Sequence, residues 1–420
     1  MSRLALFLAL AFTLLCSPAT AEWQGEEQLI DGVTHVFNPA EGMLPPQTVA
    51  LEEVWRLGGW DGGEDEFFGV IGDVMVDENN EFYVLDSQLS EINVYDESGA
   101  WLRTIGREGE GPGEFRRPTG MSRMPSGAIG VIQAWPSKLV LITPEGDPAG
   151  DFRFTPKGEG FPGLGGVRAM GDKLGIVYSV SQPDQEKGEF RRTLRLGVFE
   201  ESGDEVAEMF SVSSAMQYAD QRVVERDWNL FDQAWSASDD GRVFARTDFT
   251  EYRVGVWNAD GSPDRVIVRD YPALARSDEE RETIETRWGA RLGRWVRDPN
   301  FDIEKNWNPI ENLYARDDGS LWVRTSRGTR AASAGILATF DVYDTQGRFV
   351  REMVLEGDFD PQNDGLFLAG GYLIVVTDLV SARDAWMGGA GEEEMDGDPE
   401  PMEVVCYRMD SSAVAGLLAD

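Results

Sequence analysis

The chain has 420 residues, of which 41% are hydrophobic, and this is enough material for one large or two medium domains. Its 75 acidic residues outnumber 38 basic residues, which gives a formal net charge of −37. An electrostatic field of that sign repels nucleic acids and anionic membrane surfaces, so neither is an expected partner. The charge suits a solvated acidic surface, and a cation-binding function is the alternative interpretation.

The N-terminus has the pattern of a secretory signal. Arg3 supplies a positive charge, residues 4–15 an apolar stretch, and Ala19-Thr20-Ala21 a small-residue cleavage site. About twelve residues are too few to span a bilayer, so no membrane insertion is expected. The sequence therefore predicts a secreted or periplasmic protein, with a lipid anchor at Cys16 as the alternative.

Cysteine and histidine are both scarce. Removal of the signal leaves Cys406 as the remaining cysteine, so no internal disulfide can form. His35 is the only histidine, and it precedes the repeated region of the chain. This disfavours enzymes that use histidine clusters as metal ligands or as acid and base. We therefore predict no cofactor, no metal and no catalytic residue.

Two kinds of turn alternate along the chain. The tighter turns lie at 79–80, 126–127, 171–172, 240–241 and 318–319. The longer turns, which end in glycine, lie at 96–99, 143–146, 200–203, 258–261 and 344–347. A repeat of roughly 45 residues with four strands in each unit is typical of a β-propeller.

The turns divide the chain into units of short strands that are rich in Val, Ile, Tyr and Phe. Five units have four strands each, and a sixth has only three, at 365–368, 372–377 and 403–407. A strand at 51–57 precedes the first unit and has no partner there. If it pairs with 403–407, it closes the ring and covers an exposed sheet edge. The predicted fold is an all-β, six-bladed propeller closed by an N-terminal strand, with a helical insertion between blades four and five.

This fold predicts four segments along the chain. They are a signal peptide at 1–21, an N-terminal extension at 22–50, the propeller at 51–410 and a C-terminal tail at 411–420. Acidic residues among Gly and Pro at 389–401 match no calcium-binding loop, so we interpret this stretch as a solvated loop.

One stretch of the sequence resembles a known family. Residues 106–118, which read GREGEGPGEFRRP, resemble the linker between blades of NHL-repeat propellers. The runs at 82–86 and 92–96 resemble the body of one such repeat, and the similarity extends over about residues 70 to 120. The whole chain resembles secreted bacterial six-bladed propellers of the NHL-like type. That group is largely without assigned activity, so the resemblance implies a fold and a location but no catalytic residue.

The longest connections are predicted on one face of the propeller, where second strands lead to third strands and one blade leads to the next. They are 182–190, 211–232, 270–307, 326–334 and 380–401. Long loops in compact domains are commonly functional or disordered, so we expect this face to be the working one.

The 270–307 connection contains a predicted helix. Ser277 and Glu280 form a capping box, and the apolar residues Ile284, Trp288, Leu292 and Trp295 follow on one side at helical spacing. This side is expected to pack onto the rim of the propeller, and a lid over the central pocket is the alternative.

Polar residues near the entries to the blades form the candidate ligand-binding site. Arg246 and Arg324 occupy equivalent places in units four and five, and Arg117 enters the first strand of unit two. The corresponding entries in units one, four and five hold Asp73, Gln233 and Asn312. Arginine suits bidentate recognition of a carboxylate, so we expect the three arginines to point into one polar cavity at the channel mouth. The alternative is that each arginine pairs with a surface carboxylate.

Two functions remain open from the sequence. The preferred hypothesis is a monomeric binding or interaction module, which presents the insertion-bearing face to a protein, peptide or small ligand. The alternative is a carboxylate- or metal-dependent hydrolase or a glycan-active enzyme with its site at the central channel. Since propellers host many functions, the fold does not decide between them.

Overall fold

A computed structural model of the chain describes residues 22–60, 62–63, 67–133, 136–229, 234–292, 296, 298–387 and 401–409. The predicted signal peptide, the C-terminal tail and most of the acidic 389–401 stretch lie outside these residues. Gln233 and Trp295 also lie outside them.

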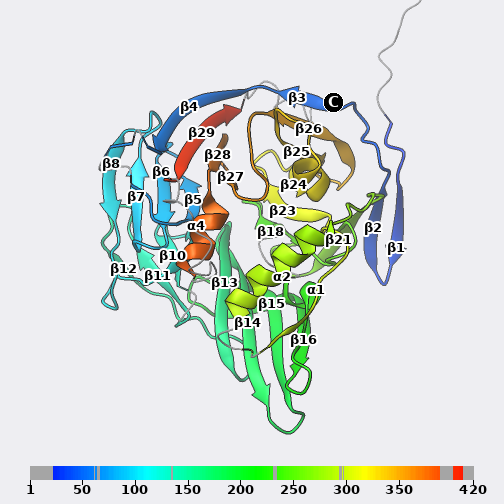
Figure 1. Cartoon of the computed structure of the whole chain (residues 1–420), viewed down its shortest axis with the longest axis horizontal. Coiled ribbons are helices and arrows are strands. Elements are labelled where there is room, and N and C mark those ends of the chain that lie inside the picture. Colours follow the sequence, from blue (N-terminus) through cyan, green and yellow to red (C-terminus); the bar gives the residue numbers. More distant parts are fainter. Residues whose placement is uncertain are drawn as a thin grey trace, which may run out of the picture.

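Six four-stranded antiparallel blades are arranged in a ring around a central axis (Figure 1). In blades one to five the strands follow one another from the axis outward, so each blade is built from neighbouring hairpins. The strands of blades one to three are β5 (Ile71–Val76), β6 (Phe82–Asp86), β7 (Glu91–Tyr95), β8 (Trp101–Ile105); β9 (Pro118–Arg123), β10 (Ile129–Gln133), β11 (Lys138–Ile142), β12 (Pro148–Asp151); β13 (Phe161–Met170), β14 (Lys173–Asp184), β15 (Glu189–Phe199) and β16 (Glu205–Gln217). Those of blades four to six are β18 (Trp235–Ala237), β19 (Val243–Arg246), β20 (Arg253–Trp257), β21 (Pro263–Arg269); β23 (Ile310–Ala315), β24 (Leu321–Thr325), β25 (Ile336–Tyr343), β26 (Phe349–Glu356); β27 (Gly365–Ala369), β28 (Tyr372–Val376), β29 (Glu403–Met409) and β4.

The ring closes as the sequence predicts. Strand β4 (Leu51–Gly58) is the outermost strand of blade six, where it pairs antiparallel with β29 and places Trp55 opposite Cys406. The two ends of the chain therefore complete the same sheet, and the six-bladed all-β fold is confirmed.

The N-terminal extension also adds strands to the propeller. Strands β1 (Glu26–Ile30) and β2 (Val33–Asn38) form a hairpin, and β2 pairs in parallel with β21 at the outer edge of blade four. The short strand β3 (Gln47–Val49) pairs in parallel with β26 of blade five. Residues 26–49 thus cover the outer edges of two blades, which would otherwise present unpaired backbone groups.

The glycine-ended turns have one geometry throughout. In all five, the glycine N–H donates to the carbonyl oxygen three residues earlier at 2.9 Å, as from Gly99 to Asp96. Each glycine has positive φ, with 82° at Gly99 and 93° at Gly203. A positive φ after a tight turn produces a bulge in the following strand, and the register of β7 with β8 shifts at Val94/Tyr95 accordingly. This backbone requirement explains why the motif recurs.

Aspartates in these turns should make the fold sensitive to acid. Hydrogen bonds from Ser98 and from nearby backbone amides lower the pKa of Asp96, and Ser262 lowers that of Asp260 in the same way. A carboxyl pKa that is lower in the folded state stabilises the fold above the ordinary value of about 4. We therefore expect the free energy of unfolding, measured with urea, to fall as the pH drops from about 5 towards 2. Asp96→Asn should reduce this dependence, and a stability that is constant with pH would contradict the prediction.

Blade three differs from the predicted pattern. Strands β14, β15 and β16 continue through 182–190 and the start of 211–232, both of which were expected to be loop insertions. That expectation is wrong because polar side chains alternate with apolar ones along β15 and β16. The Thr193 hydroxyl lies 2.8 Å from that of Ser213, while Leu194 and Met216 are buried. The long hairpins project beyond the ring at the bottom of Figure 1.

The helical insertion between blades four and five is present. Helix α2 (Asp278–Leu292) begins with the predicted capping box, in which Ser277 N donates to Glu280 at 2.7 Å and Glu280 N donates to the Ser277 hydroxyl at 3.1 Å. Its Trp288 and Leu292 pack in a cluster with the buried Val223. Strands β17 (Arg222–Val224) and β22 (Asn300–Asp302) pair in parallel within the same cluster.

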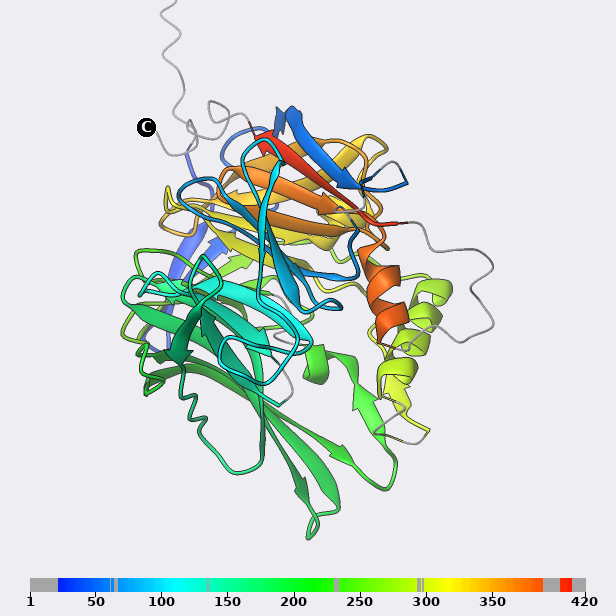
Figure 2. The same cartoon turned by 90° about the vertical axis from the view of Figure 1, so that its left-hand side faces the viewer.

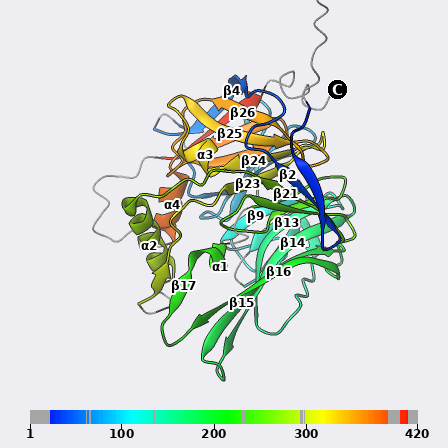
Figure 3. The same ribbon diagram turned by 90° about the vertical axis from the view of Figure 1, so that its right-hand side faces the viewer.

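Three shorter helices complete the described structure. They are α1 (Glu225–Asn229) before blade four, α3 (Ser326–Arg330) between β24 and β25, and α4 (Leu379–Trp386) between β28 and β29. Figures 2 and 3 show α2 and α4 together on one face of the ring. Within the residues described here, no helix has both the length and the apolar composition needed to cross a membrane.

Candidate functional site

The first strand of each blade faces the centre of the ring, which we call the channel region. Neighbouring inner strands lie next to one another from β5 through β9, β13 and β18 to β23, and β27 adjoins β5. Side chains from these strands that point to the axis can therefore meet although they come from distant parts of the sequence.

Arg168 on β13 lies close enough to two other blades to act on their side chains. Its charge acts on Asp73 of blade one and on Tyr314 of blade five, the two blades that flank blade six on the far side of the ring. Its Nη1 donates to the carbonyl oxygens of Met121 at 3.3 Å and Val167 at 3.4 Å. The residue is nevertheless exposed to solvent.

Asp73 lies beside Arg168. One carboxylate oxygen accepts from the Met121 N–H at 3.0 Å and the other from the Val74 N–H at 2.9 Å. Burial raises the pKa of Asp73, while the charges of Arg168 and Arg383 act in the opposite direction. Arg383 belongs to α4, so this helix contributes a positive charge above the channel.

Blade five adds a polar group to the same region. The Asn312 side-chain amide donates to the Tyr314 hydroxyl at 3.1 Å. Burial raises the pKa of Tyr314, whereas the charges of Arg324 and Arg168 lower it. The structure thus brings three predicted site residues, Asp73, Asn312 and Arg324, into one neighbourhood around Arg168 and Tyr314.

Arg324 has a carboxylate partner. Its Nε lies 3.4 Å from Glu311, which also accepts from Arg330 at 2.7 Å and from the Thr329 hydroxyl at 2.8 Å. Glu311 therefore holds β23 and α3 together and leaves Arg324 only partly neutralised.

The other predicted arginines lie elsewhere. Arg117 is exposed, has a φ of 45° and stacks over the Trp386 ring of α4 at 5.7 Å. Arg246 is only 2% exposed, donates to the Ile310 carbonyl at 2.8 Å and stacks on Phe249 at 5.2 Å. The expectation that Arg117, Arg246 and Arg324 share one cavity is therefore not met. Arg246 is buried where blade four meets blade five, and sequence position alone did not reveal that burial.

Helices α2 and α4 are linked on the face that carries the insertions. Arg287 of α2 forms an ion pair with Asp384 of α4 at 3.2 Å. Arg383 donates to the Ile71 carbonyl at the start of β5 at 3.5 Å, a long hydrogen bond. In Figure 1 both helices lie in front of the central part of the ring, and Figures 2 and 3 place them together on this face.

Sequence reasoning missed Arg168, Tyr314 and Arg383. The available signal was a charged or hydroxylated side chain in the first strand of a blade, and Arg168 is such a residue. Arg168 lies within the strand predicted at 166–170, and β13 begins five residues earlier, at Phe161.

The described residues give little support to metal or thiol chemistry. They contain no group of three or more His, Cys, Asp or Glu side chains that could hold a metal ion. Cys406 is buried in β29, and burial raises the pKa of its thiol to about 12. A thiol with that pKa remains protonated at neutral pH and is a poor nucleophile.

The comparisons with known proteins concern the fold. Residues 64–139 match a family described as a 6-bladed beta-propeller. No curated protein matches the chain in sequence. The chain is thus a six-bladed β-propeller, as its strand order and this match both show.

Solved structures with a similar fold include two Bacteroides proteins. A Bacteroides fragilis protein described as exported is 12% identical, with a TM-score of 0.46 over 87% of this chain and 100% of its own. A member of the duf4221 family from Bacteroides vulgatus is 13% identical, with a TM-score of 0.47 over 86% and 98% of the two chains. A gluconolactonase from Xanthomonas campestris is 9% identical, with a TM-score of 0.42 over 82% and 87%. Similarity at this level carries no statement about activity.

Proposed function

We propose that this propeller is a binding protein whose site lies in the central channel, below α2 and α4, and that its ligand carries an anionic group such as a carboxylate. The observation that carries the proposal is the environment of Arg168. Among the described residues, only the carbonyls of Met121 and Val167 accept hydrogen bonds from its guanidinium, both at Nη1. The Nε and Nη2 donors remain for a ligand, and this edge of the guanidinium matches the geometry of a carboxylate.

The surrounding charges support an anionic ligand. Arg168, Arg324 and Arg383 approach the channel from three different blades, and their charges act on Asp73 or Tyr314. Among the described residues, the carboxylates near these arginines are Asp73, which accepts two backbone amides, Glu311, which is held by Arg330 and Thr329, and Asp384, which pairs with Arg287. The region is therefore locally positive within a chain of net charge −37.

The competing hypothesis of a carboxylate-dependent enzyme has less support. Such chemistry needs two carboxylates that face each other across a substrate. Asp73 and Glu311 instead bind neighbouring backbone and side-chain groups. The signal-like pattern of residues 1–21 favours an exported protein, and we propose that it acts as a monomer outside the cytoplasm.

The proposal predicts a strong effect of Arg168→Gln. We expect one or more of acetate, succinate and citrate to bind, as measured by isothermal titration calorimetry at low salt. The substitution should weaken this binding by about 10-fold to 100-fold, because it removes a charge-assisted pair of hydrogen bonds. The melting temperature should change little, since the side chain is exposed and its two protein contacts are long.

Arg153→Gln is the matched control. Arg153 is also exposed, and none of its side-chain atoms forms a hydrogen bond or ion pair with another described residue. This control should bind the anion as tightly as the unmodified protein. If none of the three anions binds, or if both variants bind equally well, the channel is not an anion site.

A further inference from the structure

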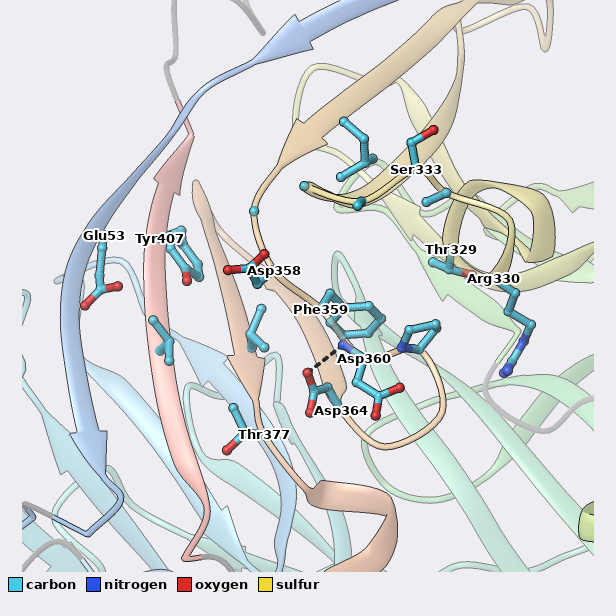
Figure 4. A pocket seen from close by; sticks show the side chains of 18 of the residues that line it. Glu53, Thr329, Arg330, Ser333, Asp358, Phe359, Asp360, Asp364, Thr377 and Tyr407 are labelled. Carbon is cyan, nitrogen blue, oxygen red and sulfur yellow. Dashed lines mark hydrogen bonds between the residues drawn. The ribbon is translucent and has the colours of Figure 1, made fainter.

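A second opening lies on the same face, between blades five and six (Figure 4). It is a cleft of about 790 Å³, and none of its lining residues belongs to the channel group around Arg168. Three parts of the chain form its walls: the segment from Thr329 to Ile336, the connection between β26 and β27, and the blade-six strands β28, β29 and β4. A cleft of this size can hold a small molecule or a side chain of a partner.

One part of the inner surface of the cleft is apolar and aromatic, and the rest is polar or charged. Val375 and Val405 are buried at its base, and Tyr407 and Phe359 add two aromatic rings. Figure 4 shows the Tyr407 ring beside Asp358, with Phe359 farther along the same connection. Such a surface can bury an apolar stem and can stabilise a cation through the face of an aromatic ring.

Both basic residues of the cleft are already neutralised. Arg56 pairs with Glu53 at 2.8 Å and also with Glu403. Arg330 pairs with Glu311 at 2.7 Å and stacks on the Trp307 ring at 3.7 Å. Neither guanidinium is therefore available to balance further negative charge in the cleft.

Three aspartates of the cleft, of which Asp358 and Asp360 are exposed, have no cationic partner among the described residues. Asp364 accepts backbone amides from Asp360 at 2.8 Å and Asp378 at 3.1 Å. The side chain of Asp360 accepts the Gln362 amide at 2.9 Å. Asp358 accepts no hydrogen bond and forms no ion pair with any described residue, although its charge acts on Tyr407.

The environment of these groups favours an added positive charge. Burial raises the pKa of Asp364, and the negative charges of Asp360 and Asp378 raise it further. Burial likewise raises the pKa of Tyr407, to which Glu53 and Asp358 also contribute. A cation in the cleft would relieve the repulsion among these groups.

We propose that this cleft binds an organic cation, namely a primary ammonium group on an apolar stem. The ammonium would be held by Asp358, which has spare acceptors, and the stem would lie over Val375, Val405 and the aromatic rings. The whole chain, at −37, would attract such a cation from a distance. A small amine and a lysine side chain of a protein partner share this chemistry. The proposal is independent of the anion site in the channel.

The test compares n-hexylammonium with hexan-1-ol by isothermal titration calorimetry on the full chain. We expect the ammonium to bind about tenfold or more tightly than the alcohol, because only the ammonium can pair with Asp358. Asp358→Asn should weaken ammonium binding by about five- to tenfold while hexan-1-ol binding stays unchanged. A peptide of sequence Gly-Lys-Gly with blocked ends tests whether a lysine side chain can supply the ammonium group. Binding of either probe with this dependence on Asp358 supports the proposal and identifies the source.

Asp172→Asn is the matched control, since Asp172 is exposed, has no hydrogen bond or ion pair among the described residues and lies in the turn between β13 and β14, outside the cleft. It should leave binding within about twofold of the original value. Asp358→Ser is a second variant in case Asp358→Asn alters the melting temperature. The proposal is overturned if neither probe binds, if the alcohol binds as tightly as the ammonium, or if Asp172→Asn weakens binding as much as Asp358→Asn.

Discussion

Replacement of Trp55 by alanine should lower the free energy of unfolding by about 3–5 kcal/mol. Trp55 lies on β4, the strand that closes the ring, and is only 6% exposed. Its indole packs edge-on against Phe82 with ring centroids 5.2 Å apart, and it stacks near Tyr95 at 6.4 Å. Both partners belong to blade one, so this residue joins the last sheet of the ring to the first. The substitution removes a large buried side chain and weakens the closure in one step.

The measurement is urea-induced unfolding followed by circular dichroism. Trp60→Ala provides the control, because Trp60 follows β4 in the sequence but is 73% exposed, and this change should alter stability by no more than about 0.5 kcal/mol. Equal effects of the two substitutions would mean that the closing strand does not depend on its contact with blade one.

Glu225→Gln should destabilise the layer formed by α1, α2, β17 and β22 by about 3–5 kcal/mol. The Glu225 carboxylate accepts from both terminal nitrogens of Arg276, at 2.7 Å and 2.9 Å, and from the Glu304 N–H at 2.8 Å. Both charged side chains are almost completely buried. Removal of the negative charge leaves a buried guanidinium without a counter-ion, and the contact between α1 and the segment that leads to α2 is lost.

We expect this loss to appear as local unfolding. Hydrogen exchange should accelerate in α1 and α2, while exchange in the propeller strands stays slow. Arg226→Gln is the control, since Arg226 pairs with Glu304 at 3.4 Å on the surface and should contribute about 1 kcal/mol or less. Equal exchange rates in α2 for the Glu225 variant and the unmodified protein would show that the buried pair does not hold this layer.

The fold was predictable because its signals are local. A glycine at positive φ and a polar residue that accepts backbone amides mark each turn, as at Asp96 and Gly99, and these depend on neighbouring residues only. The closing strand could also be inferred, because a three-stranded last unit leaves an edge that needs a partner. The length of β14 to β16 was underestimated, since the polar residues that alternate with apolar ones in these strands resemble a loop in sequence.

The candidate site was predictable only in part. Residues such as Asp73, Asn312 and Arg324 could be chosen from their equivalent places in the repeat. Convergence at the axis depends on the three-dimensional ring, so the role of Arg168 could not be inferred from neighbouring residues. Arg246 has the same position in its blade as Arg324, yet one is buried between blades and the other borders the channel group. The cleft beside Asp358 arises from contacts between blades five and six, which have no counterpart in the linear sequence.

The pairing of β4 with β29 sets an order on folding. Blades one to three consist of neighbouring hairpins and can form as soon as their own residues are available to fold. Strands β2, β3 and β4 must instead wait for β21, β26 and β29, which are made much later. The N-terminal stretch is therefore the first to be synthesised and the last to find its sheets. A chain that stops short of β29 leaves the ring open, with β4 free to pair with an edge of another molecule.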